Sequence, residues 1–525
     1  MKLPIVKSLH IENFTGTGID VADYFNKNAV IGEYEDGRIY ATQRPSIDIF
    51  DDASAAGVSA IGRGIYFWRK ADAGVGDRYI VIDDKVYKGS LGAGSLIHTL
   101  DQGGGTSPVY FVEMVNYLVI LDPENQAGYY IDVVADDEVV VQITDADFIG
   151  QSGNDDTLIA GGVFLDGRCY VAGESGAIYV SDANTPVTWP DDFINKISAE
   201  READRAVFID KHLDHIVLFG SRTIEFFYNA GNPAGQSPLS KRQDISHNIG
   251  MLQGDASWRE GDNIYFVGVY PSGPLQVLRL SQFQLESIST PEIETYISNA
   301  RLVEDANLFS SGFSSGKRTF YILTFYRLLA GVVTPSITLA FDGISWGIWD
   351  TDVDGLDKFP LLGWTIRSGS AARSGEGIMF NGDLVTIRDD FIPTETVLAS
   401  GYFESVGATE YIQDGYYVSS GGTGVNVVMT VRTGPFDGDT NYWKFGHTLE
   451  VVGDESSSTG TATALVKWAD GNSTTFNAGR TVSLNKKEKI TRLGRFKRRN
   501  HEVVIDIDEQ YRIEALEMQL TEGGH

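Results

Sequence analysis

Residues 166–189 read DGRCYVAGESGAIYVSDANTPVTW, and this stretch decides the fold class of the chain. An Asp-Gly pair opens a β run, a Gly-containing turn follows, and a second β run leads to Trp189. Similar units recur along the chain, and no catalytic constellation of comparable quality accompanies them. The pattern therefore predicts a modular all-β scaffold with a structural or docking role.

The repeating units are roughly 45 to 60 residues long, which is in or slightly above the range of propeller blades. Turn pairs such as Asp36-Gly37, Asp342-Gly343 and Asn381-Gly382 supply the positive φ angles of tight hairpins. We expect a β-propeller-like domain of degenerate four-stranded blades over residues 1–395 and a C-terminal β-rich domain over residues 396–525. The last strands could instead return to the propeller, and a series of β-sandwiches stays open as the alternative fold.

Helical periodicity is scarce in this sequence. Residues 291–305, PEIETYISNARLVED, place Ile293, Tyr296, Ile297 and Ala300 on one helical face. Residues 191–205 form a second, acidic candidate. Both segments are expected to be short connectors between sheets.

The composition excludes several classes of protein. Cys169 is the only cysteine, so neither an intrachain disulfide nor a cysteine-based zinc site is expected. No run approaches 18 apolar residues and no secretory signal is visible, so we expect no membrane span and synthesis in the cytoplasm. A formal net charge of −30 disfavours general adhesion to nucleic acid or anionic membrane.

One block has the opposite charge. Residues 486–499, KKEKITRLGRFKRR, hold eight Lys or Arg against the single Glu488. A solvated pair of strands would explain such a block, and a docking patch for an acidic partner is the sharper hypothesis. The candidate docking residues are Lys486, Lys487, Arg495, Lys497, Arg498 and Arg499.

Motifs that resemble reactive sites are better explained as loops. Two G-x-S-x-G matches, at residues 312–316 and 343–347, are each followed by a strand, whereas a nucleophile elbow needs a helix there. Asp350, Asp352 and Asp354 form a D-x-D-x-D-G pattern that suits Ca²⁺, but the Glu expected at its twelfth position is Leu361. We therefore expect no catalytic residue, no cofactor and no metal site beyond this weak candidate.

His212 and His215 are expected to point to opposite faces of an extended strand rather than to form a metal pair. A glycosidase would need two carboxylates facing each other across a cleft, and the sequence selects no such pair among 72 Asp and Glu residues.

Several segments, taken in order, resemble one family. They are DGRIYATQRPSIDIF (36–50), GRGIYFWRK (62–70), YIVIDDKVYKGSLGAG (79–94), GSRTIEFFYNAGNPAGQSPLSKRQDISHNIGM (220–251), ISTPEIETYI (288–297), VKWADGNSTTF (466–476) and ITRLGRFKRRNHEVVIDI (490–507). This order is similar to that of the packaged-DNA stabilisation proteins, also called tail hub or nozzle proteins, of short-tailed bacteriophages.

The resemblance implies a virion structural protein of the phage tail that is not an enzyme. It implies a homo-oligomeric, hexameric ring at the distal end of the tail, docked beneath an adaptor ring, with tail fibres or spikes nearby. Such a ring would retain packaged DNA and form part of the ejection conduit, and genomic DNA would pass its acidic lumen without specific binding. A β-propeller glycan hydrolase or glycan-binding protein is the alternative function, and an elongated trimeric adhesin is a third.

Overall fold

The computed structural model describes the following residues of the chain: 2–4, 13–15, 18–20, 25–34, 37–58, 61–69, 76–132, 139–151, 156–190, 197–199, 204–233, 236–271, 273–302, 306–315, 318–329, 332–351, 358–367, 374–388, 413–414, 424–425, 427–433, 436, 442–453, 462–471, 473, 475–486, 488–507 and 511–523.

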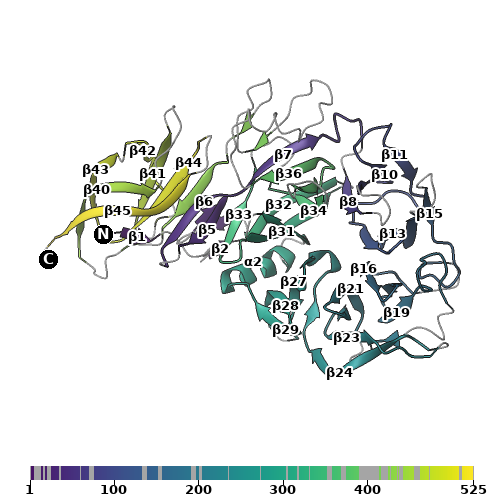
Figure 1. Ribbon diagram of the computed structural model, residues 1–525. Helices are drawn as coiled ribbons and strands as arrows, with labels where there is room; N and C mark the ends of the chain where they lie inside the picture. The colour runs from purple at the N-terminus through teal and green to yellow at the C-terminus, as the bar shows by residue number, and fades with distance from the viewer. Residues whose placement is uncertain are drawn as a thin grey trace.

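Most of these residues form a β-propeller (Figure 1). In the described part of the chain, seven antiparallel sheets of four main strands follow one another, and β34 of the last sheet contacts β8 of the first. The predicted blade architecture is therefore confirmed, and a series of separate sandwiches does not describe this part of the chain. The first three blades are β8 (Gly62–Trp68), β9 (Asp77–Ile82), β10 (Lys85–Lys88) and β11 (Leu96–Thr99); β12 (Tyr110–Glu113), β13 (Tyr117–Asp122), β14 (Ala127–Asp132) and β15 (Val140–Gln142); and β17 (Val163–Leu165), β18 (Arg168–Ala172), β19 (Ala177–Val180) and β20 (Ile197–Ser198).

The remaining blades continue in chain order. They are β21 (Ala206–His212), β22 (His215–Gly220), β23 (Ile224–Asn229) and β24 (Leu239–His247), with β16 (Ala160–Gly161) beside β21; β26 (Ser257–Glu260), β27 (Asn263–Val269), β28 (Leu275–Ser281) and β29 (Gln284–Ser287), with β25 (Gly250–Met251); β30 (Asn307–Ser315), β31 (Arg318–Leu329), β32 (Val332–Phe341) and β33 (Trp346–Trp349); and β34 (Leu361–Arg367), β35 (Ser374–Met379) and β36 (Leu384–Arg388) completed by β7 (Ser46–Asp51).

The last blade takes its fourth strand from the N-terminal part of the chain. Strand β7 pairs antiparallel with β36, with Ile47 opposite Ile387 and Ile49 opposite Val385. Ile47 and Ile49 are buried in the core of this blade. The ring is therefore closed by strands that are far apart in the sequence, which ties the two ends of the propeller together.

Tight turns of the predicted type join the strands. In the fold-deciding segment, Asp166 and Gly167 have φ angles of 49° and 81°. A two-residue hairpin turn whose twist matches that of its strands requires a positive φ angle at both residues. The turn joins β17 to β18, with Leu165 opposite Arg168, as the Asp-Gly signal predicts.

A β-sandwich lies beside the propeller (Figure 1). One sheet has the order β43 (Lys489–Phe496), β40 (Lys444–Gly453), β45 (Arg512–Glu522), β6 (Ile39–Gln43) and β5 (Ala29–Glu33), with β1 (Lys2–Pro4) on β45. The other contains β42 (Arg480–Ser483), β41 (Thr463–Asp470), β44 (Arg499–Ile505), β39 (Met429–Arg432) and β4 (Phe25–Lys27). Both sheets contribute to one apolar core, for example Leu449 and Leu516 from the first and Val466 and Ile505 from the second.

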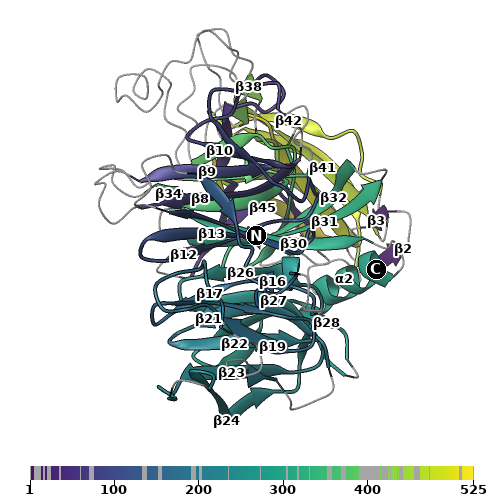
Figure 2. The same cartoon turned by 90° about the vertical axis from the view of Figure 1, so that its right-hand side faces the viewer.

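The sandwich and the propeller share a sheet. Strand β4 pairs with β39 of the sandwich on one side and, in parallel, with β33 of the sixth blade on the other. In the view turned by 90° (Figure 2), the blades lie toward the viewer and the yellow strands of the sandwich lie behind them. The boundary expected near residue 395 lies outside the described residues, so this division into domains stays a prediction.

Few other elements are described. Helix α2 (Pro291–Leu302) buries Ile293, Tyr296, Ile297 and Ala300, as the periodicity predicts. In the second candidate helix, residues 197–198 form β20, and most of its other residues lie outside the described part. The short elements are the 3₁₀ turn η1 (Gly254–Ala256), the hairpin β2 (Asn13–Thr15) and β3 (Gly18–Asp20), β37 (Gln413–Asp414) and β38 (Gly424–Val425).

Candidate interaction surface

Side chains bridge the axis of the propeller where its inner strands begin. Tyr110 opens β12 of the second blade, and Asp255 precedes β26 of the fifth blade on the opposite side of the ring. The Tyr110 hydroxyl donates a hydrogen bond of 2.7 Å to Asp255 Oδ1. Desolvation raises the pKa of the Asp255 carboxyl, and the hydrogen bonds from Tyr110 and Gln253 oppose that rise.

The far end of the axis is also lined by polar contacts between blades. The Tyr66 hydroxyl of the first blade donates to Glu113 Oε2 of the second at 2.5 Å, and Arg259 of the fifth forms a 2.9 Å ion pair with Asp210 of the fourth. Burial and Glu113 raise the pKa of Tyr66, and the positive charge of Arg259 opposes that rise. A duplex does not fit through this axis, because the hydrogen bond between Tyr110 and Asp255 joins non-adjacent blades across it.

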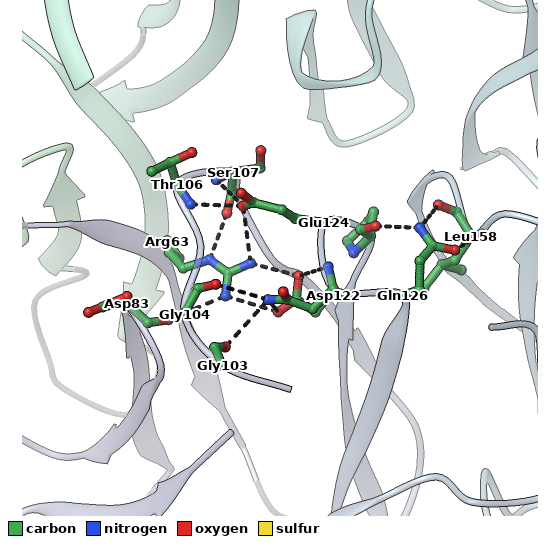
Figure 3. Close-up of polar contacts among 12 residues, drawn as sticks. Arg63, Asp83, Gly103, Gly104, Thr106, Ser107, Asp122, Glu124, Gln126 and Leu158 are labelled. Atoms are coloured by element: carbon green, nitrogen blue, oxygen red, sulfur yellow. Dashed lines mark hydrogen bonds and ion pairs between the residues drawn. The ribbon is translucent and has the colours of Figure 1, made fainter. Parts of the chain in front are cut away.

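A buried ion pair ties the first two blades together (Figure 3). Arg63 on β8 donates from Nη1 and Nη2 to both carboxylate oxygens of Asp122, at 2.9 and 2.7 Å, and both side chains are fully buried. Arg63 Nε donates to Ser107 O in the loop between the blades. Glu124 accepts the backbone N–H groups of Thr106 and Ser107 of the same loop. This network therefore orders the connection between the blades.

Many carboxylates of this acidic chain hold loops in place. One of them is Asp204, whose Oδ2 accepts the backbone N–H groups of Arg222 and Thr223 at 2.8 and 3.0 Å. Similar acceptors for loop N–H groups are Asp51 for Leu91, Asp156 for Ser175, Asp342 for Ser345 and Asp383 for Ala53. Carboxylates thus satisfy backbone donors that short β loops leave unpaired.

The basic block runs along β43, at the edge of one sheet of the sandwich, and through the turn that leads to β44 in the other sheet, so it is not one compact patch. Exposed Lys486 precedes β43, and the exposed Lys497 and Arg498 form the turn after it. A strand of this length spans roughly 23 Å, so Lys486 and the turn lie at opposite ends of β43. Lys487 lies outside the described residues.

Arg499 differs from the expectation of an exposed docking residue. It is 1% exposed, and its guanidinium donates to Asp470 Oδ2 at 2.9 Å and to Leu493 O at 2.7 Å. The guanidinium also lies 4.2 Å from the centre of the Phe496 ring. Arg499 is not available to a partner because its guanidinium connects β44 to Asp470 of β41 and to Leu493 of β43.

Aromatic side chains accompany the remaining basic residues. Trp443 is 42% exposed and lies under Arg495 and Lys497, whose charged groups are 4.8 and 5.5 Å from its ring centre. We call Tyr442, Trp443, Phe445, Arg495, Lys497 and Arg498 the tip patch. The sequence prediction missed its aromatic half, although three aromatics within residues 442–445 were a readable signal.

The weak metal candidate stays a prediction. Asp350 forms ion pairs with Lys27 and Lys358 at 2.9 and 3.4 Å, and Asp352 and Asp354 lie outside the described residues. In the described ranges, no three His, Cys, Asp or Glu side chains gather as metal ligands would. No helix in these ranges is long and apolar enough to cross a membrane.

The expectation that His212 and His215 point to opposite faces of one extended strand is wrong. His212 and His215 lie opposite each other across the β21–β22 hairpin, and both contact the ring of Phe283, with centroids 5.1 and 5.0 Å apart. They share a face because the chain reverses between them. The G-x-S-x-G match that starts at Gly312 lies at the end of β30, and β31 follows it.

Several solved structures match the chain. The WD40 repeats of RRP9 match with a TM-score of 0.35 and 10% identity, over 66% of this chain and 99% of that one. The Cps50 (Swd1) β-propeller domain of Myceliophteria thermophila matches with a TM-score of 0.37 and 8% identity, over 63% and 96%. The computationally designed Ika8 protein matches with a TM-score of 0.33 and 11% identity, over 74% and 99%.

Sequence comparison identifies the family. No curated protein matches the chain. Residues 15–330 match the family model of phage stabilisation proteins that is described as "Bacteriophage P22 Gp10, beta-propeller". These residues are more than half of the 525 in the chain and include β8 to β31 of the propeller. The chain therefore belongs to this family, and it is a bacteriophage structural protein involved in stabilising packaged DNA.

Proposed function

We propose that this protein is the nozzle or hub subunit of a short phage tail. Copies would form a homo-oligomeric ring, hexameric in our proposal, at the distal end of the tail, beneath an adaptor ring and near the tail fibres or spikes. The ring would retain the packaged genome and form part of the ejection conduit without any bond chemistry. The family match over residues 15–330 is the observation that carries this proposal.

The closed propeller axis supports a conduit that lies between subunits. Tyr110 and Asp255 bridge the axis within one subunit. A passage for duplex DNA would therefore run between several subunits rather than through one propeller. The net charge of −30 favours such a passage, because acidic walls repel phosphates and let DNA slide without adhering.

Loss of the protein from the particle should release the genome. We would compare phage particles made with and without the full-length chain, and measure the nuclease-protected DNA per particle. We expect heads that lack the protein to package DNA and then lose it, and purified protein added to freshly filled heads to restore retention. Particles that lack the protein and keep their DNA but fail to adsorb to cells would contradict the proposal and favour a glycan-binding role.

A further inference from the structure

The tip patch holds most of the exposed aromatic surface of the described residues. Among those residues, four aromatic side chains stand out as exposed, and three of them are Tyr442, Trp443 and Phe445, at 42, 42 and 45% exposure. The fourth is Tyr228, on the propeller, at 38%. Tyr, Trp and Arg are the residues that most often dominate protein interfaces. A cluster of three aromatics with three basic residues is therefore a candidate for such a contact.

The patch lies at the end of the molecule farthest from the propeller. Lys444 pairs with Phe496 and with Glu522, so the patch lies beside the last residues of β45. Figure 1 shows the C-terminus at the outer end of the sandwich, away from the blades. A surface at this end can contact another molecule without interference from the blades of its own chain.

Hydrogen bonds to backbone carbonyl groups hold the segments of the patch together. Lys444 is fully buried, and its Nζ donates to Tyr442 O and Lys497 O, both at 3.2 Å. The Gly523 N–H donates to Trp443 O at 2.8 Å. These bonds connect the start of β40 to the turn at Lys497 and to Gly523. A surface ordered in advance loses little entropy when it binds.

A partner is expected to bind the side chains of the tip patch rather than to add a strand to the edge of the sheet. Strand β43 is at the edge of its sheet, but Thr491 O accepts from Arg480 and Leu493 O accepts from Arg499. Arg492 and Gly494 have φ angles of 60° and 76°, which distort the edge further. These features are typical of strand edges protected against pairing, so the aromatic and basic side chains remain as the binding elements.

Charge limits what can cover the patch. The tip patch has three basic residues, Arg495, Lys497 and Arg498, and none of its six residues is acidic. Two tip patches placed face to face would bring like charges together, which excludes a two-fold contact between them. The rest of the chain is strongly acidic, so another part of a second copy is complementary to the patch.

We propose that the tip patch docks onto the acidic body of a second copy of this chain. The contact joins two different surfaces and is therefore heterologous, which is the kind of interface that closes rings. The inference rests on the proposed function, because it supplies the contact between subunits of the tail ring. Trp443 is the anchor, and Arg495, Lys497 and Arg498 supply the charge.

The test measures the association of the purified full-length chain by native mass spectrometry and sedimentation. We expect the wild type to self-associate, more weakly at high salt, and Trp443→Ala to weaken association by roughly 30-fold or more. Tyr228→Ala is the matched control, because it removes the exposed aromatic on the propeller, and it should associate like the wild type. Urea unfolding midpoints identify any variant that fails to fold.

A charge-reversal variant tests the heterologous geometry. The triple variant Arg495→Glu, Lys497→Glu, Arg498→Glu should not associate alone, but its intact acidic body should accept a wild-type tip in a mixture. The matched control reverses three described charges elsewhere, Lys486→Glu, Arg205→Glu and Arg222→Glu, and should associate normally.

Three results would overturn the inference: a wild-type chain that stays monomeric, tip variants that assemble like the wild type, or a tip that binds duplex DNA in place of a second copy. None of these depends on whether particles lacking the protein lose their DNA, so failure of the inference and failure of the proposed function are distinguishable.

Discussion

Replacing Arg63 by Met should lower the free energy of unfolding of the propeller by about 3 to 5 kcal/mol. Both members of the Arg63–Asp122 pair are fully buried, and the guanidinium is bound to both carboxylate oxygens. Methionine retains most of the side-chain volume but leaves the Asp122 charge buried with only the N–H groups of Asn125 as donors. Urea titration of the purified chain measures the effect.

The double variant Arg63→Met, Asp122→Asn separates the ion pair from packing. Neutralising Asp122 removes the unpaired charge, so the double variant should be more stable than Arg63→Met alone. Arg38→Met is the control, because this exposed arginine pairs with Glu514 at the surface, and its loss should change stability by less than about 1 kcal/mol. A double variant no more stable than the single one would show that the charge is not what Arg63 compensates.

Acidification should destabilise the sandwich through His501. This side chain is fully buried on β44, and neither ring nitrogen has a hydrogen-bond partner among the described residues. Burial, with a smaller contribution from the charge of Arg499, lowers the pKa of His501 from 6.5 to about 3. Below pH 6.5 the unfolded chain binds a proton that the native state does not, so stability falls as pH decreases.

The loss from this one group between pH 7 and pH 5 is about 2 kcal/mol. His501→Leu should remove that part of the pH dependence, so the difference in stability between wild type and variant should change by this amount over the interval. The comparison uses the change in the free energy of unfolding with pH, measured by urea titration. Any loss of packing in the variant that does not depend on pH therefore cancels. An unchanged slope in His501→Leu would contradict the account.

Local patterns in the sequence were sufficient to predict the blades and the helix. Asp166 and Gly167 adopt the predicted turn, and Ile293, Ile297 and Ala300 form the buried face of α2. Such features depend on neighbours within a few residues, where turn chemistry and periodicity act directly. Turn residues and hydrophobic periodicity are therefore readable wherever strands or helices that are neighbours in the sequence pack together.

Pairings between distant parts of the chain were not predictable in this way. Nothing in residues 46–51 indicates that they pair with β36, and nothing near Phe25 indicates a strand shared by the propeller and the sandwich. The candidate surface was also only partly predictable, because it depends on contacts between distant residues. The basic run 486–499 was visible in the sequence, but the burial of Arg499 depends on Asp470 in a neighbouring strand.

The most direct test of the account is a cryo-electron microscopy reconstruction of the tail in intact, DNA-filled particles. The account predicts several copies of this chain around the tail axis, with DNA in the passage between copies and protein side chains across the axis of each propeller. DNA density through the axis of a single propeller, or tails in which this chain forms no ring, would contradict it.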